Sequence, residues 1–183
     1  MRRRPAIIVL LFCLLLGFGG SAAAQYTTIQ VKTAFLFNFA KFTSWPTQHS
    51  PQQTGELIVG IMGRDPFGPA LQPFRDYRIH GRPVRIRDVS TLAEARGCHI
   101  LFIADSESPR LRQILQQLPQ SGLLTVSDIP GFAARGGMIE LLKIDQRIRF
   151  IINLDASRKA GLTLSAHLLK LARNVISARG QEP

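Results

Sequence analysis

The stretch Leu57-Ile-Val-Gly-Ile-Met62 decides the fold of this chain. A continuous apolar run of strand length predicts a β-strand that is buried on both faces. Short helices and strands alternate after it. The expected elements are a helix over residues 68–76, an edge strand over 83–89, a helical turn over 92–96, a buried strand over 100–103, a helix over 109–118 and a strand over 123–126. This alternation predicts right-handed crossovers and a mainly parallel sheet.

The pattern changes toward the C-terminus. Two apolar runs, residues 138–144 and 147–153, flank Asp145-Gln146 and are close enough to pair only as an antiparallel hairpin. Ser165 is a suitable N-cap for a helix over residues 166–176 that would cover one side of the sheet. The predicted fold is therefore a single α/β domain, a Rossmann-like sandwich whose mixed, mainly parallel sheet carries an antiparallel C-terminal hairpin and is flanked by helices.

The N-terminus has the features of a secretory signal peptide. Three arginines precede an apolar stretch over residues 6–18, and Ser21-Ala-Ala-Ala24 supplies the small residues of a cleavage site. We expect cleavage after Ala24, which makes residues 1–24 the signal peptide and residues 25–183 a periplasmic domain. A lipoprotein anchored through Cys13 and an uncleaved N-terminal anchor are the alternatives.

Charge and cysteine content restrict the partners further. The full chain carries a net charge of +11, but an exported protein does not meet nucleic acid, so lipid headgroups, polysaccharide and acidic protein domains are the expected contacts. A basic surface without a binding role is the alternative. Cleavage removes Cys13 and leaves Cys98 free, without a disulfide partner, in a predicted buried strand where it acts as a small apolar residue.

From Ala34 to Phe42 only Asn38 and Lys41 are polar, which predicts a helix that is apolar on nearly every side. One face could cover the sheet while another meets a second subunit or a partner protein. The candidate interface residues are Leu36, Phe37, Ala40, Lys41 and Trp45. A helix buried wholly within its own domain is the alternative.

A second candidate site follows from the parallel sheet, in which ligands gather at the carboxyl ends of the strands. The side chains and glycines expected there are Gly63, Arg64, Asp65, Ser106, Ser127 and Asp128. Arg64 beside free backbone N–H groups would suit a phosphate or carboxylate. The acidic residues at this edge could equally be helix caps and turn formers.

Catalytic and metal-binding patterns are missing from the sequence. The four histidines lie far apart along the chain, and no HExxH, GxSxG or paired-cysteine spacing occurs. We therefore predict a protein that is not an enzyme, with no metal and no cofactor.

Several motifs resemble one family, in order along nearly the whole exported part. They are the Phe-Asn-Phe-Ala-Lys-Phe block ending at Trp45-Pro46, the segment from Gly60 to Phe67, Cys98-His-Ile-Leu-Phe102, Gly136-Gly-Met-Ile-Glu140 and Leu168-Leu-Lys-Leu-Ala172. With these motifs the chain resembles the YfiR-like (YfiR/HmsC-like) family of periplasmic regulators.

The resemblance implies a non-catalytic periplasmic regulator, often a homodimer, that binds and represses a membrane-bound signalling enzyme. A diguanylate cyclase or histidine kinase is the expected partner, with cyclic-di-GMP signalling and biofilm formation as the output. The resemblance also implies a possible small aromatic or nucleotide ligand. A periplasmic small-molecule binding protein or enzyme that uses the strand-end cleft is the alternative. Because Cys98 stands alone, the internal disulfides of the family cannot form here.

Overall fold

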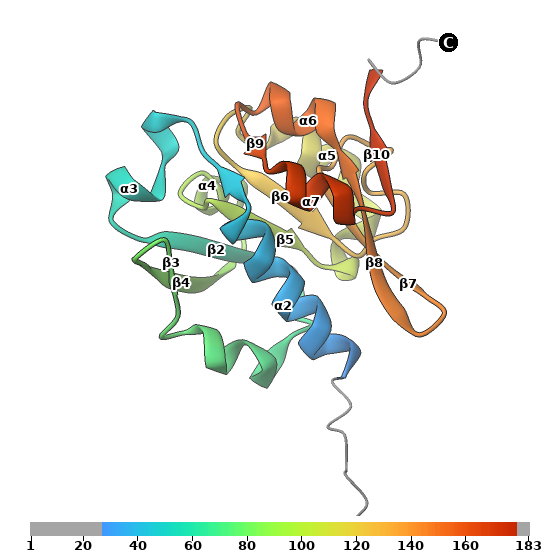
Figure 1. Cartoon of the computed structure of the whole chain (residues 1–183), viewed down its shortest axis with the longest axis horizontal. Coiled ribbons are helices and arrows are strands. Elements are labelled where there is room, and N and C mark those ends of the chain that lie inside the picture. Colours follow the sequence, from blue (N-terminus) through green and yellow to red (C-terminus); the bar gives the residue numbers. More distant parts are fainter. Residues whose placement is uncertain (1–26, 179–183) are drawn as a thin grey trace, which may run out of the picture.

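A central eight-stranded sheet organises the protein (Figure 1). The computed structural model describes residues 27–178. The strands of this sheet are β2 Leu57–Met62, β3 Arg78–Ile79, β4 Arg82–Val89, β5 Ile100–Ile103, β6 Leu124–Ser127, β7 Ile139–Ile144, β8 Arg147–Asn153 and β10 Asn174–Ile176. They lie in the order β10-β8-β7-β6-β5-β2-β4-β3.

The middle of the sheet is parallel, as the sequence predicts. β2 pairs with β4 and β5, β5 pairs with β6, and β6 pairs with β7, all in parallel register. Ile100 and Phe102 of β5 pack into one core cluster, while Leu101 and Ile103 pack into the other. All four side chains are fully buried, because neighbouring residues of a strand point to opposite faces and both faces are covered. β4 lies close to the sheet edge, where only the two-residue strand β3 borders it.

Helices cover the two faces of the sheet. The helical elements are α2 Thr28–Lys41, η1 Thr47–His49, α3 Pro51–Thr54, η2 Gly68–Phe74, α4 Leu92–Ala95, η3 Asp105–Arg110, α5 Leu111–Gln117, α6 Leu154–Lys159 and α7 Ala166–Leu171, of which those labelled η are 3₁₀ helices. α2 and α7 contribute to the first core cluster, and α4 and α5 to the second. The mixed α/β fold predicted from the sequence is thereby confirmed.

α2 is the longest helix, and its apolar residues fix it to the sheet. It begins with a capping box in which Thr27 and Gln30 satisfy each other's backbone N–H groups. Phe35 and Phe39 pack against Phe150 of β8, with ring centroids 5.4 and 5.1 Å apart respectively. Edge-on aromatic contacts stabilise the packing beyond what the burial of apolar area alone contributes. α2 therefore joins the start of the chain to a strand near its end.

The antiparallel hairpin is present, but it does not form the edge of the sheet. β7 and β8 pair from Ile139↔Ile152 to Ile144↔Arg147, and the two turn residues Asp145 and Gln146 have positive φ values of 46° and 60°. Positive φ values at both turn residues are typical of a two-residue hairpin turn, whose backbone twist matches that of the flanking strands. The sheet continues beyond the hairpin because β10 pairs with β8 in parallel register.

The predicted helix over residues 166–176 is wrong beyond Leu171. The backbone N–H of Arg173 donates to the carbonyl of Phe150 at 2.8 Å, which starts the pairing of β10 with the free side of β8. Val175 and Ile176 are β-branched residues that suit a strand. The edge of β8 thus overrides a helical pattern that was plausible from local sequence alone.

Several short elements were missed by the sequence analysis. β1 (Thr43–Ser44) and β9 (Thr163–Leu164) form a separate antiparallel pair that ties the end of α2 to the segment before α7. The predicted loop over residues 47–55 contains η1 and α3. Elements of two to four residues leave no periodic pattern to detect.

The predicted signal peptide and Cys13 lie outside the described residues. None of the helices between residues 27 and 178 combines the length and the apolar character that a membrane crossing requires. Cys98 is buried and free, and burial raises the pKa of its thiol.

Candidate functional site

The largest cavity described in the structure is an apolar groove of about 750 Å³ between α2 and η2. It is lined by Thr27, Ile29, Gln30, Val31, Ala34, Phe35 and Asn38 from α2 and its cap, and by Phe67, Pro69, Ala70, Pro73 and Phe74 from the η2 segment. We call it the α2 groove. Neither side contributes a charged residue, so the groove offers shape and apolar contact.

The walls of the α2 groove are continuous with the core. Phe74 stacks on the buried Phe37 of α2, with ring centroids 3.9 Å apart and parallel planes. Phe67 makes an edge-on contact with Phe102 of β5 at 4.6 Å. Ile29, in the lining, is 44% exposed, and Tyr77, whose ring meets Phe74 edge-on, is 49% exposed. Because the core holds its walls, the groove is preformed.

Three of the residues that were predicted to lie at an interface are buried within the domain instead. Leu36 and Ala40 are fully buried and Phe37 is 3% exposed, because the sheet packs against one side of α2 and η2 packs against another. The helix is apolar nearly all round since its own domain covers most of it. The exposed α2 residues in the lining of the groove are Ile29, Gln30, Ala34 and Asn38.

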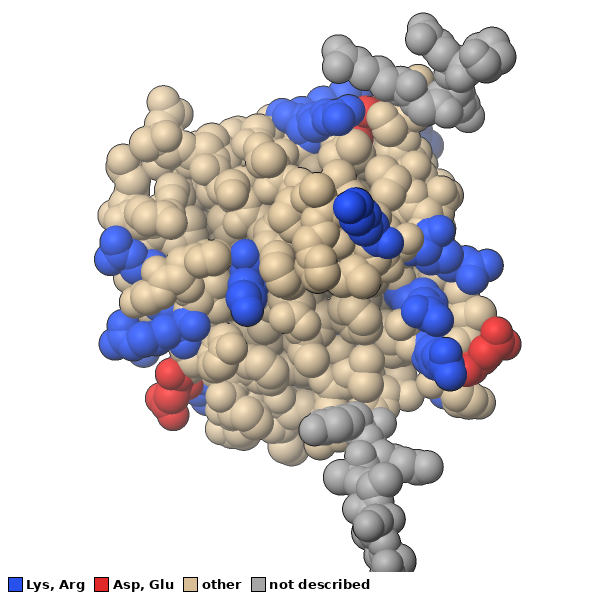
Figure 2. Space-filling model, viewed as in Figure 1, with Lys and Arg blue, Asp and Glu red and all other residues tan. Residues whose placement is uncertain are grey.

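Charge is distributed unevenly around the α2 groove. Figure 2 shows that the area over α2 and the segment beside it is mostly uncharged, whereas Lys and Arg side chains lie around its margin and outnumber acidic ones. The exposed Lys41, at the end of α2, is one of these basic residues. An apolar centre with a basic margin is complementary to an apolar segment flanked by acids.

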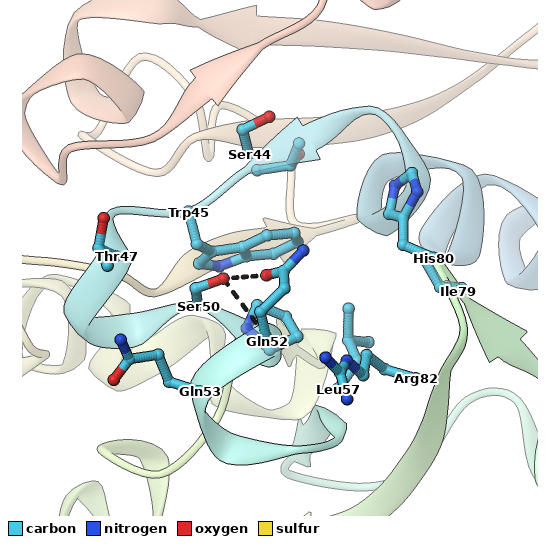
Figure 3. A pocket seen from close by; sticks show the side chains of 12 residues that line it. Ser44, Trp45, Thr47, Ser50, Gln52, Gln53, Leu57, Ile79, His80 and Arg82 are labelled. Atoms are coloured by element: carbon cyan, nitrogen blue, oxygen red, sulfur yellow. Dashed lines mark hydrogen bonds between the residues drawn. The ribbon is translucent and has the colours of Figure 1, made fainter.

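A second cavity, of about 560 Å³, lies at the amino end of β2 and is shown in Figure 3. We call it the tryptophan pocket. Its lining residues are Thr43, Ser44, Trp45, Thr47, Ser50, Pro51, Gln52, Gln53, Leu57, Ile79, His80 and Arg82. Six of these twelve residues carry a hydroxyl or a side-chain amide, and Arg82 is the one Lys or Arg side chain in the lining. This pocket lies at the opposite end of the parallel strands from the edge where the sequence predicted a ligand.

Trp45 is held rigidly at one side of the tryptophan pocket. Its indole Nε1–H donates to the backbone carbonyl of His99 at 3.2 Å, and the two rings meet edge to face. Nδ1 of His99 accepts the backbone N–H of Ile58 at 3.0 Å, so the neutral ring carries its proton on Nε2, 3.3 Å from Thr54 Oγ1. Burial lowers the pKa of His99 to about 4. The sequence suggested Trp45 as an interface residue; the structure places it in this pocket, half-buried.

The predicted strand-end residues only partly come together. The hydroxyl of Ser106 accepts the backbone N–H of Arg64 at 2.9 Å, which joins the ends of β5 and β2. A side chain at Gly63 would meet Ser106 and Glu107 at 2.5 and 2.8 Å, so these groups already fill the space beside the glycine. Asp65 accepts the backbone N–H groups of Phe67 and Gly68 and is a turn-forming cap.

Ser127 and Asp128 also have structural partners. Ser127 Oγ donates to the carbonyl of Ile103 at 2.7 Å and accepts the N–H of Ile129 at 3.0 Å. Asp128 accepts from Lys32 Nζ of α2 at 2.6 Å. None of the six predicted strand-end residues lines any of the cavities described within residues 27–178. A ligand at this edge stays a prediction.

Comparison with known proteins identifies the chain. The structure is an α/β domain with an apolar groove, and within residues 27–178 no three or more His, Cys, Asp or Glu residues cluster so that they could hold a metal ion. The chain belongs to the YfiR/HmsC-like family, whose model matches residues 29–173. This membership confirms the resemblance seen in the sequence. It is consistent with a periplasmic regulator of cyclic-di-GMP signalling, and the family is in general one of non-catalytic regulators.

Solved structures support the fold. A conserved domain protein from Vibrio cholerae O1 biovar eltor has a TM-score of 0.58 and 9% sequence identity, over 82% of this chain and 60% of that chain. This chain thus spans 60% of the length of that protein. The ABC domain in complex with L-Trp from Streptococcus pneumonia has a TM-score of 0.48 and 14% identity, over 66% and 55% of the two chains, and carries no argument at that similarity.

Proposed function

We propose that this protein is a non-catalytic periplasmic regulator that binds the periplasmic region of a membrane-bound signalling enzyme and represses it. A diguanylate cyclase is the first candidate for the partner and a histidine kinase the second. The single observation that carries the proposal is the α2 groove, which presents preformed apolar walls to solvent in a protein of the YfiR/HmsC-like family. Exposed apolar surface of this kind is typical of protein-binding sites.

The chemistry of the groove indicates what part of the partner it binds. Phe35 and Phe74 supply aromatic walls, and Ala34 leaves space between them for an inserted side chain. An aromatic or branched apolar residue from a helix or loop of the partner would fill that space. Acidic residues on either side of this anchor would meet the basic margin. Repression would follow if the bound partner were held in its inactive conformation.

The test is capture of the solubilised membrane partner by immobilised regulator carrying changes at Ala34. Ala34→Glu places a carboxylate in the apolar groove and should weaken capture at least about tenfold, because the charge loses water without gaining a partner. Ala34→Gln has nearly the same size without the charge and should retain more binding. Gln116→Glu on α5, on the other face of the sheet, controls for the change in net charge. Unchanged capture by Ala34→Glu would exclude the groove as the docking site.

Small-ligand binding is the second candidate function. The volume of the α2 groove falls within the range of small-molecule sites, and its phenylalanine walls suit an aromatic compound. The groove suits a nucleotide less well, because no Lys or Arg side chain lines it to bind the phosphate groups. Displacement of an environment-sensitive fluorescent dye from the groove by aromatic compounds, compared between the wild type and Ala34→Glu, tests this function.

The homodimer expected from the family resemblance is also a proposal. Two copies meeting through the α2 groove would bring two basic margins together, so we expect self-association there to strengthen with salt. Sedimentation equilibrium at low and high ionic strength measures this. A dimer that is unaffected by both salt and Ala34→Glu would use another surface.

A further inference from the structure

Several polar side chains that line the tryptophan pocket are not used to support the fold. The side chains of Ser44, Thr47 and Arg82 make no hydrogen bond or ion pair within residues 27–178. Ser50 and Gln52 hydrogen-bond to each other, and Thr43 is bonded to the carbonyl of Phe39. Polar groups that gather in a cavity without supporting the fold are available to a ligand.

Trp45 gives the pocket one apolar surface in a fixed orientation. The bond from its Nε1–H to His99 uses the polar atom of the indole, so only the hydrocarbon part of the ring is offered to the cavity. Leu57 and Ile79 add apolar area beside it. Figure 3 shows the indole next to the side chain of Gln52, with Arg82 extending toward both from β4. Binding would not need to order the ring, which lowers its entropic cost.

This combination matches one class of ligand. A pyranose ring has a hydrocarbon face that packs on an indole and an equator of hydroxyl groups that both donate and accept hydrogen bonds. Ser and Thr hydroxyls and Gln amides can return both kinds of bond, whereas a guanidinium donates two parallel bonds to a carboxylate. An aromatic ligand would leave these polar groups unpaired, and the α2 groove suits it better.

The charge of the ligand follows from the lining. Arg82 is the single Lys or Arg, no Asp or Glu lines the pocket, and His80 uses Nε2 in a bond with the carbonyl of Lys41 at 2.9 Å. One guanidinium can neutralise one carboxylate, but a nucleotide with several phosphate charges would need more cations. We propose that the tryptophan pocket binds a saccharide that carries one carboxylate on the bound sugar, of the uronic-acid type. This site is independent of the proposed docking function of the α2 groove.

The experiment uses the exported protein and the fact that the chain contains a single tryptophan. Emission from Trp45 therefore reports on the pocket alone. We expect trigalacturonate to shift or quench this emission in a saturable way and to release heat in calorimetry. Maltotriose, a neutral saccharide of the same length, should bind at least about tenfold more weakly, which corresponds to the loss of one charged contact.

Two matched variants locate the effect. Arg82→Gln should reduce affinity for trigalacturonate at least about tenfold and leave maltotriose unchanged, because it removes the charge and keeps a hydrogen-bonding group. Arg85→Gln lies on the same strand, outside the pocket, and should bind as the wild type does. Trp45→Phe, measured by calorimetry, should weaken both saccharides.

Three results would overturn the proposal. The first is that neither saccharide changes the emission or releases heat at roughly 10 mM, which would exclude binding with a Kd of about 1 mM or tighter. The second is an equal loss with Arg82→Gln and Arg85→Gln, which would indicate diffuse attraction of anions. The third is that free tryptophan binds the pocket more tightly than trigalacturonate and displaces it, which would assign the pocket to aromatic ligands. Each readout uses purified protein without a partner, so loss of partner capture does not affect it.

Discussion

The α2 groove and the tryptophan pocket lie beside opposite ends of the same helix, but they are built in opposite ways. The walls of the groove are core residues such as Phe74, whose ring is stacked on the buried Phe37. In the pocket, by contrast, the side chains of Ser44 and Thr47 make no hydrogen bond within residues 27–178. The difference teaches that the aromatic walls of the groove cannot be altered without cost to the fold, whereas the pocket can change those polar side chains that have no bonded partner.

The largest effect that can test this contrast is expected at Leu36. Leu36→Asp should unfold the domain, because an unpaired carboxylate would enter a fully buried site at a cost of at least about 5 kcal/mol. Ala34→Glu, two residues earlier on the outer side of the same helix, should melt within a few degrees of the wild type. Thermal unfolding followed by circular dichroism measures both. A folded Leu36→Asp protein would mean that the inner side of α2 is open to solvent.

The next effect concerns the wall of the groove. Phe74→Ala should lower the free energy of unfolding by roughly 2 kcal/mol, which is less than for a fully buried phenylalanine because the ring is half-exposed. Tyr77→Ala, at an exposed ring that contacts Phe74, is the matched control and should cost less than about 1 kcal/mol. Denaturant unfolding gives both values. Equal effects would show that Phe74 in the wall and the exposed Tyr77 contribute equally to the stability of the fold.

A pH-dependent effect is expected behind the tryptophan pocket. The folded protein holds His99 neutral down to about pH 4, while the unfolded chain protonates it near its ordinary pKa of 6.5. The unfolded state therefore binds more protons, and stability falls as the pH decreases from 6.5 toward 4, by on the order of 1–2 kcal/mol at pH 5.

The matched variant for this effect is His99→Asn. Its amide can still accept the N–H of Ile58 but does not titrate, so the fall in stability between pH 6.5 and 5 should become smaller by the same amount. Urea unfolding at several pH values measures the slope. An identical slope in both proteins would assign the acid sensitivity to other groups.

The smallest effect belongs to the pocket's polar wall. Ser44→Ala and Thr47→Val should each change the free energy of unfolding by less than about 0.5 kcal/mol, since neither hydroxyl has a bonded partner in the described structure. Thr43→Val provides the contrast, because the buried Thr43 hydroxyl donates to the carbonyl of Phe39 at 2.7 Å, and its loss should cost about 1 kcal/mol or more. If Ser44→Ala destabilised the protein as much as Thr43→Val, the pocket wall would have a structural role.

How well the sequence predicts each element depends on whether local residues or distant contacts decide its conformation. The run Leu57–Met62 and the hairpin around Asp145-Gln146 were recognisable because each has a local signature, in apolar length or in turn chemistry. Residues 172–176 were predicted as helix because their conformation is decided by the distant edge of β8. β1 and β9 were missed because each consists of two residues.

The sites were harder to predict than the fold. The aromatic content of α2 drew attention to that helix, but only the packed structure shows that Leu36, Phe37 and Ala40 are buried within the domain. A usable signal was the apolar, proline-containing segment Gly68-Pro-Ala-Leu-Gln-Pro-Phe74, which needs a partner surface. The tryptophan pocket assembles residues 43–57 with residues 79–82, and no local pattern joins them.

The contact between α2 and β8 has a consequence for the life of the newly made chain. Synthesis proceeds from the N-terminus, so Phe35 and Phe39 emerge long before Phe150, against which their rings finally pack. During that interval the aromatic side chains of α2 lack their native packing partner, and contacts between residues so far apart in the sequence form slowly. We therefore expect the helix that gives the finished protein its groove to be prone to aggregation while the rest of the chain is still being made.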